Sequence, residues 1–235
     1  MFNRISKFKY LFKLFIFIPL IFYFGKRSYV AFDEGFYALQ ARWILDKGNW
    51  IIPLWWDEYV LDRTIGLQFL IAKSQETFGE NLFSAYLPTT IASIIMLLVT
   101  YKLHEELFEK KYAIVSPLIL SSTYLWFDYS HLATQDIIYS CLVTIGIFSL
   151  VKAEKTKKNI YILLFGLWIG LAFMMKTFLV AVPLAALFPY LLKKRNLLFT
   201  KFFWIGLLIG FSPYFIWAHS INSYLDQNIT VSYTH

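Results

Sequence analysis

Charged residues are scarce in this sequence: they make up 16% of the 235 residues, whereas 58% are hydrophobic and 20% are aromatic. A water-soluble domain of this size needs more charge to cover its surface. The composition therefore excludes a sizeable soluble domain and predicts a chain whose main solvent is lipid.

Cysteine is almost absent, because Cys141 is the single one in the chain. It has no partner, so an intrachain disulfide is excluded. The sequence also lacks internal repeats, low-complexity tracts and flexible Gly/Ser-rich linkers. These absences predict one module over residues 1–235.

Long apolar runs, by contrast, are abundant. A helix needs ~20 mainly apolar residues to cross the ~30 Å hydrocarbon layer of a bilayer. Runs of this kind, bounded by charge, predict an all-α transmembrane bundle with about seven spans. The predicted spans are residues 12–25, 85–103, 112–127, 137–151, 160–175, 177–192 and 202–219.

The net charge of +7 is unevenly distributed over this topology. With a cytoplasmic N-terminus, most of the 22 basic residues lie on the cytoplasmic side, and most acidic residues lie on the other side. The basicity therefore indicates orientation in the membrane and not nucleic-acid binding. The first span follows a basic stretch, as a signal peptide does, but bulky Tyr29 in the candidate cleavage zone favours a retained anchor.

The long connection at residues 26–84 is the first extracytoplasmic loop of this topology, and we expect function there. Spans two to seven follow at 85–219, with an extracytoplasmic tail at 220–235. Within the loop, the spacing of Phe36, Leu39 and Trp43 predicts an amphipathic surface helix between Asp33 and Lys47, which ends before Gly48.

A second amphipathic helix is expected to begin near Asp62 and to end at Gly79. The connection between the two helices is rich in Trp and Tyr, which favour the headgroup layer of a membrane. The loop is therefore predicted to lie on the outer leaflet as an interfacial platform.

Charged side chains from four parts of the sequence fall on the same outer side. Each has a plain structural explanation: Asp33, Glu34 and Asp62 are suited to helix N-termini, and Asp136 to a solvated loop. Lys176 interrupts an apolar stretch, where a Lys at mid-bilayer costs ~2.5–3.5 kcal/mol, so it is expected to reach the surface or to meet an anion.

Together these side chains suit a reaction on a lipid-linked phosphate. Arg63 and Lys176 would neutralise the leaving phosphate, and a carboxylate would orient or deprotonate the acceptor. Two or three of the acids could also hold a divalent metal cation.

Five short segments, taken in order, resemble the successive signatures of membrane glycosyltransferases of the GT-C type. The nearest branch, glycosyltransferase families 39 and 83, contains lipid A aminoarabinose transferases and bacterial relatives of protein O-mannosyltransferases. The segments are FDEGFYA at 32–38, GNWIIP at 48–53, LDR at 61–63, YLP at 86–88 and GLAFMMK at 170–176.

The resemblance implies an inverting transfer of sugar from a polyprenyl-phosphate donor to a lipid, glycan or protein acceptor. The reaction would take place on the outer face of the bacterial inner membrane. Members of the family continue beyond this length, so the resemblance implies the N-terminal part of a longer enzyme, or a minimal version of one.

Residue by residue, Asp33 and Asp136 match the family's catalytic acids, and Lys176 matches its later lysine. Asp62-Arg63 stands where many members have an acid, Lys and Pro, so that Thr64 replaces the Pro. Glu34 and Asp62 would support the site or its metal, and His235 matches a metal-binding His only if a short gap is allowed.

Two other functions fit the same residues. A small transporter or channel would line its route with Asp136 and Lys176, but it needs polar residues at mid-depth, and the spans offer few. A non-catalytic lipid-binding subunit would bind the donor without turnover.

Overall fold

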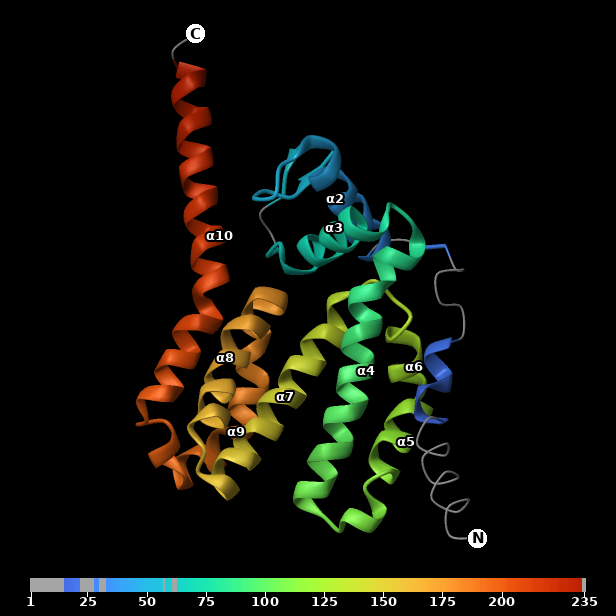
Figure 1. Cartoon of the computed structure of the whole chain (residues 1–235). Helices are drawn as coiled ribbons and strands as arrows, with labels where there is room; N and C mark the ends of the chain where they lie inside the picture. Colours follow the sequence, from blue (N-terminus) through green and yellow to red (C-terminus); the bar gives the residue numbers. More distant parts are fainter. Residues whose placement is uncertain (1–14, 22–27, 30–32, 57, 61–62, 234–235) are drawn as a thin grey trace.

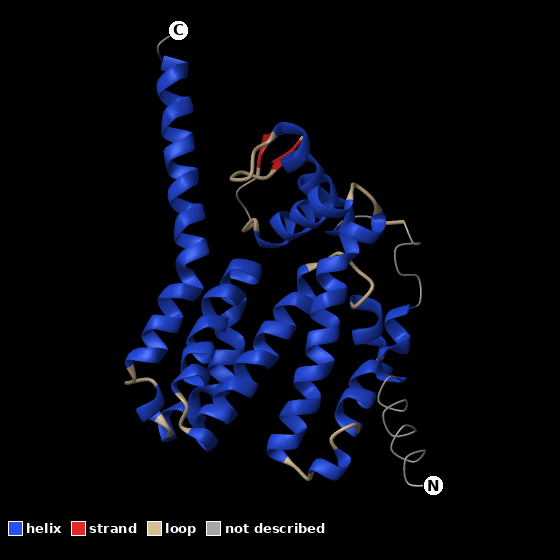
Figure 2. Cartoon of the chain, viewed as in Figure 1, coloured by secondary structure: helices blue, strands red, loops and turns tan. Residues whose placement is uncertain are grey.

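The computed structural model of the chain describes residues 15–21, 28–29, 33–56, 58–60 and 63–233, with side chains as far as Ser223. These residues are almost entirely helical, apart from one two-stranded sheet (Figure 2). Two of the predicted site residues, Asp62 and His235, lie outside the described residues.

The described elements follow one another as short 3-10 helices, two very short strands and longer α-helices. In chain order they are η1 Phe15–Ile21, α2 Asp33–Lys47, β1 Leu54–Trp55, β2 Glu58–Tyr59, α3 Gly66–Phe78, α4 Leu82–Leu107, η2 Lys110–Tyr112, α5 Val115–Ser122, α6 Tyr124–Tyr129, α7 Gln135–Thr156, α8 Asn159–Lys176, η3 Thr177–Val180, α9 Ala181–Lys193, η4 Arg195–Leu197 and α10 Lys201–Tyr233.

Four helical stretches of the described chain are long and apolar enough to cross a membrane: Leu82–Leu107, Gln135–Thr156, Asn159–Lys193 and Lys201–Ser223. Many large apolar side chains on these helices are exposed in the isolated chain, as they are on helices that face lipid. The chain is therefore an integral membrane protein built from helices.

The third of these stretches folds back on itself at Thr177, where φ is 43° and ψ is −122°. Beyond this break, Leu179 accepts a hydrogen bond of 2.9 Å from the Tyr139 hydroxyl, near the start of α7. Tyr190, late in α9, donates instead to Glu154 near the end of α7. Consequently α8 and α9 run in opposite directions, and Lys176 lies at the turn between them.

The predicted span at 112–127 is divided in the structure into α5 and α6, which meet at Thr123. The Thr123 side-chain hydroxyl donates to the Leu120 carbonyl at 2.7 Å, and the Thr123 backbone N–H donates to the same oxygen at 3.1 Å. A side chain that competes for a carbonyl in this way favours the end of a helix.

Four glycines allow α8 and α10 to pack backbone against backbone (Figure 1). A Cβ on Gly166 or Gly170 would overlap the backbone of α10, and a Cβ on Gly206 or Gly210 would overlap a carbonyl oxygen of α8. Each pair is four residues apart, which is the spacing of small residues on closely packed membrane helices.

The segment formed by α2, the β1–β2 hairpin and α3 lies beyond one end of α4, α7 and α8 (Figure 1), and we call it the outer segment after its predicted position. Helix α2 has the predicted bounds, and it is followed by Gly48 at φ +65°. The start predicted for the second helix was wrong, because α3 begins at Gly66 rather than near Asp62. Its predicted end is confirmed, since Gly79 follows Phe78 at φ +87°.

The residues whose spacing predicted α2 are not the ones that it buries in the protein. The buried residues include Tyr37, Ala41 and Ile44, whereas Phe36 and Trp43 are half-buried. The rings of Phe36 and Trp43 lie instead against Trp55 of the hairpin, at centroid distances of 4.7 and 6.3 Å. The hairpin was not predicted, because two strands of two residues leave no recognisable alternation.

We predict that Gly170→Ala loosens the α8–α10 contact and lowers the free energy of unfolding by about 1–3 kcal/mol, the usual cost of overpacking. Thermal unfolding of the purified chain in detergent measures the loss. Leu208→Ala is the control, because Leu208 is an exposed α10 side chain. Equal melting of the Gly170→Ala variant and the parent chain would contradict the packing described above.

Candidate functional site

A buried carboxylate joins the start of α2 to the segment that leads into α7. Glu34 is 2% exposed, and its Oε1 accepts the backbone N–H of Ala133 at 2.7 Å. A buried carboxylate is tolerated only where it has such partners. Because Asp33 precedes Glu34 and Asp136 follows Ala133 by three residues, this hydrogen bond brings the two predicted acids to one region.

Asp33, Tyr37 and Arg63 form the first half of the site. The Arg63 Nη1 donates to the Tyr37 hydroxyl at 2.8 Å and pairs with Asp33 Oδ1 at 3.4 Å, and its guanidinium lies 5.1 Å from the centre of the Phe36 ring. Tyr37 follows Asp33 by one helical turn, so both side chains face the same cation.

These contacts set the protonation of both groups. Burial raises the pKa of the Tyr37 phenol, as do the charges of Asp33 and Asp136, while Arg63 opposes the change. Burial works against the charged form of Arg63, but Tyr37 and Asp33 offset it and raise the pKa of the guanidinium above its ordinary value. At neutral pH this half of the site therefore holds a neutral phenol and a permanent cation.

Asp136 and Lys176 form the second half. Asp136 lies in the first turn of α7, and Lys176 is the last residue of α8. Their Oδ1 and Nζ atoms are 2.5 Å apart, and their side chains are 38% and 24% exposed. Lys176 therefore meets an anion, which was one of its two predicted alternatives, and this anion is the Asp136 carboxylate.

Thr64 ties the two halves together. Its buried hydroxyl donates to the carbonyl oxygen of Met174 in the last turn of α8, at 2.7 Å. The last carbonyls of a helix have no partner within it, so Thr64 satisfies one that would otherwise be unpaired. Gly66 fits beside the same carbonyl, where a Cβ would lie 2.5 Å from the Met174 oxygen.

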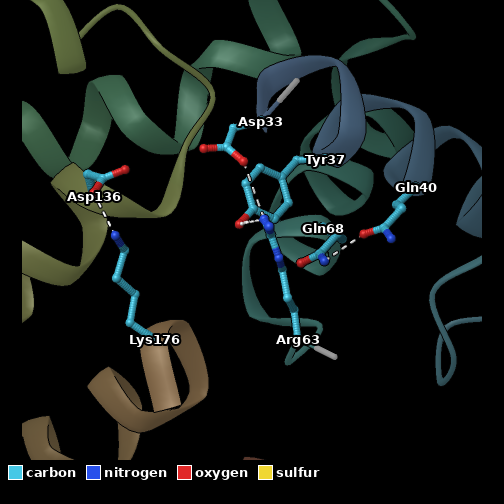
Figure 3. Close-up of polar contacts among 7 residues, drawn as sticks. All are labelled: Asp33, Tyr37, Gln40, Arg63, Gln68, Asp136 and Lys176. Carbon is cyan, nitrogen blue, oxygen red and sulfur yellow. Dashed lines mark hydrogen bonds and ion pairs between the residues drawn. The ribbon is translucent and has the colours of Figure 1, made fainter. Parts of the chain in front are cut away.

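Both ion pairs line one cavity of about 290 Å³, together with Gln135, Thr177 and a few apolar side chains. Figure 3 shows Lys176 reaching Asp136 while Arg63 extends in a similar direction towards Asp33 and Tyr37. Two cations and two carboxylates line this cavity. The cations are suited to binding an anion, and a carboxylate is suited to accepting a hydrogen bond from a polar group beside that anion.

Four predicted residues therefore meet: Asp33, Arg63, Asp136 and Lys176. Glu34 does not line this cavity, because its carboxylate is directed to Ala133. Sequence reasoning did not assign the other residues of the lining to the site, Tyr37 and Gln135 among them. Tyr37 was detectable by its helical spacing from Asp33, whereas Gln135 gave no signal beyond its place next to Asp136.

Among the described side chains, no group of three or more His, Cys, Asp or Glu residues is close enough to hold a metal ion. Of the residues predicted to support a metal, Asp62 and His235 lie outside the described part of the chain. The carboxylates of Asp33 and Asp136 are each paired with a cation instead. The divalent metal cation therefore stays a prediction.

An apolar groove of about 560 Å³ adjoins the polar cavity, with Met175 in the lining of both. Its walls come from α3, α7, α8 and α10, and they include Phe69, Leu142 and Ile216. The indole N–H of Trp217 on α10 donates to the Ile51 carbonyl at 2.7 Å and fastens this wall to the outer segment.

The chain is similar to known proteins over most of its length. The family model described as dolichyl-phosphate-mannose-protein mannosyltransferase matches residues 62–217, which is more than half of the chain.

Two curated relatives are named undecaprenyl phosphate-alpha-4-amino-4-deoxy-L-arabinose arabinosyl transferases. The protein from Proteus mirabilis is 29% identical over 213 residues, 88% of this chain and 38% of the relative. The protein from Photorhabdus laumondii is 28% identical over 172 residues, 71% of this chain and 31% of the relative. The chain thus spans about a third of these relatives' length.

Among solved structures, the chain superimposes on ArnT from Cupriavidus metallidurans bound to undecaprenyl phosphate, with a TM-score of 0.82 and 17% identity. The match covers 93% of this chain and 42% of that one. The apo state of the same protein gives a TM-score of 0.81. The fold is therefore that of ArnT over the part that the two chains share.

We predict that Thr64→Val releases the outer segment from α8. Loss of the hydroxyl leaves the Met174 carbonyl unpaired, at a cost of about 1–3 kcal/mol. Hydrogen exchange of the backbone around residues 63–67 should accelerate in this variant, whereas Thr64→Ser, which keeps the hydroxyl, should behave like the parent chain. Unchanged exchange in Thr64→Val would show that this hydrogen bond does not hold the segment.

Proposed function

The chain belongs to the dolichyl-phosphate-mannose-protein mannosyltransferase family, and from that membership we propose that it forms the donor-binding and catalytic part of an inverting glycosyltransferase. The enzyme takes a sugar from a polyprenyl-phosphate donor and transfers it to an acceptor outside the cytoplasm. The names of the relatives begin with an undecaprenyl phosphate-linked sugar, which supports a polyprenyl-phosphate donor.

The observation that carries the proposal is that a polar cavity and an apolar groove share Met175 in their linings. A polyprenyl phosphate has the matching shape, because its anionic headgroup is joined directly to a long apolar chain. Each CH₂ group buried in the groove contributes ~0.8 kcal/mol, and the charged headgroup meets the two cations beside it.

In this proposal Arg63 and Lys176 bind the phosphate, and they exchange part of their pairing with Asp33 and Asp136 for the ligand. Guanidinium suits this role because its N–H groups match phosphate oxygens two at a time. Asp33 orients or deprotonates the acceptor, and Asp136 is the second acid. The acceptor attacks C1 of the sugar opposite the phosphate, which leaves with the bonding electrons and is stabilised by the cations.

The same proposal includes a topology of seven spans with a cytoplasmic N-terminus in a bacterial inner membrane. The excess of Lys and Arg on the side of the predicted cytoplasmic loops supports it. The reversal of α8 into α9 also supports it, since the fold-back produces two short spans from one apolar stretch. The site then lies at the outer surface, where the headgroup of the donor is found.

We predict that Asp33→Asn abolishes sugar transfer in membranes while polyprenyl-phosphate binding persists, because the amide cannot accept the acceptor's proton. Arg63→Ala should instead weaken that binding by about tenfold or more, the worth of one charge-assisted contact. Arg42→Ala is the matched control, because this exposed arginine pairs with Asp46 on α2.

Transfer rates and binding of radiolabelled undecaprenyl phosphate are measured on the same membranes. Undiminished transfer by Asp33→Asn would remove Asp33 from the mechanism. Firm donor binding by the parent chain without any turnover would favour the lipid-binding subunit over the enzyme.

A further inference from the structure

A cavity of about 350 Å³, which we call the rear cavity, lies on the side of α2 opposite the polar cavity of the site. Gly35, Leu39 and Arg42 line it, and their spacing of four and three residues places them on one face of the helix. Asp33 and Tyr37 line the polar cavity from the other face. The two cavities share no lining residue among those described, so the rear cavity is a separate site.

The other walls of the rear cavity bring it to the end of a membrane helix. They include Tyr29, Gln75 near the end of α3, Glu80 and Leu82. Leu82 is the first residue of α4, which is the first of the four apolar helical stretches long enough to cross a membrane. Phe83 beside it is exposed in the isolated chain, as apolar side chains that face lipid are. The rear cavity therefore lies at the depth where lipid headgroups meet the protein.

The charges in the lining are balanced. Arg42 is the cation and Glu80 the carboxylate among the described residues that line the cavity. Arg42 pairs with Asp46 only loosely, through Nε at 3.5 Å, and its side chain is 65% exposed. Glu80 has no ion pair with another described residue. One cation and one carboxylate around a single cavity suit a ligand that carries both charges itself.

A buried acceptor in the lining specifies the positive group of such a ligand. Gln75 is 7% exposed, and its Oε1 is buried without a hydrogen-bond partner among the described residues. An unpaired buried acceptor is costly unless a bound group satisfies it. Gln75 and Glu80 together offer acceptors for two N–H groups. A primary ammonium has three N–H donors and fits them, whereas a quaternary ammonium has none.

Tyr29 adds a donor for the negative group. Burial raises the pKa of the Tyr29 phenol, and so does the charge of Glu34. The phenol therefore keeps its proton at neutral pH, and its O–H can donate to a phosphate oxygen alongside the guanidinium of Arg42.

From these observations we propose that the rear cavity binds the phosphoethanolamine headgroup of a membrane phospholipid. The ammonium donates to Gln75 Oε1 and to the Glu80 carboxylate, and the phosphate accepts from Arg42 and Tyr29. The bound lipid bridges α2, the end of α3 and the start of α4, so it stabilises the outer segment on the membrane helices. The inference does not depend on the proposed function, because the headgroup and the sugar donor occupy different cavities.

Native mass spectrometry of the purified chain, titrated with lipids, tests this assignment through the affinity of the first bound lipid. The probes are phosphatidylethanolamine, phosphatidylcholine and phosphatidylglycerol with identical acyl chains. Phosphatidylcholine keeps both charges but has no N–H group, and phosphatidylglycerol lacks the cation. We expect the parent chain to bind phosphatidylethanolamine about tenfold more tightly than either of the others, the effect of one charge-assisted hydrogen bond.

Three variants separate the two ends of the headgroup. Gln75→Leu combined with Glu80→Ala removes both acceptors, so phosphatidylethanolamine and phosphatidylcholine should bind equally. Arg42→Ala should weaken both lipids by a similar factor, because both contain the phosphate. Glu76→Ala is the matched control, since this exposed carboxylate pairs with Lys73 and should leave the tenfold preference intact. Melting in lipid-free detergent shows whether each variant is folded.

Equal affinity of the parent chain for phosphatidylethanolamine and phosphatidylcholine would overturn the inference, and so would tighter binding of phosphatidylglycerol. A preference for phosphatidylethanolamine that survives the loss of both acceptors in a folded variant would also overturn it. Soluble phosphoethanolamine should not displace the lipid at equal concentration. If it does, the site takes a soluble ligand, and the assignment to a membrane lipid is wrong.

Discussion

Two buried hydrogen bonds fasten the outer segment to the membrane helices, and the geometry of the site depends on them. Glu34 binds the Ala133 N–H and Thr64 binds the Met174 carbonyl, each at 2.7 Å. Each bond lies within three residues of the charged side chains that it positions. Leaving either buried group unpaired costs about 1–3 kcal/mol. The ion pairs themselves are partly exposed and contribute less, so the hydrogen bonds and not the charges set the arrangement.

The membrane helices provide a rigid base for this attachment. Gly170 and Gly210 bring α8 and α10 into backbone contact, which fixes the end of α8 where Met174 and Lys176 lie. The same two helices form one wall of the apolar groove. A single packing arrangement therefore places the polar cavity beside the apolar groove.

Much of this could be predicted from the sequence, because lipid imposes strong rules on it. Apolar length and charge asymmetry predicted a helical membrane bundle, and Gly48 marked the end of α2. The four charged residues of the cavity were predicted from their common side and from the family resemblance. The sequence could not predict Thr64 bonding to Met174, 110 residues away, since such a contact leaves no local pattern. The start of α3 was misplaced for the same reason, because Thr64 is held by that contact and Arg63 by Tyr37 and Asp33 before the helix begins.

The central claim is that Asp33 and Asp136, about a hundred residues apart in sequence, face one headgroup on one side of the membrane. Single cysteines at positions 33 and 136, in a Cys141→Ser background, can be labelled in sealed vesicles with a membrane-impermeant maleimide. The account predicts that both react from the outer side and that undecaprenyl phosphate protects both. Reaction from opposite sides, or protection of one position alone, would contradict it.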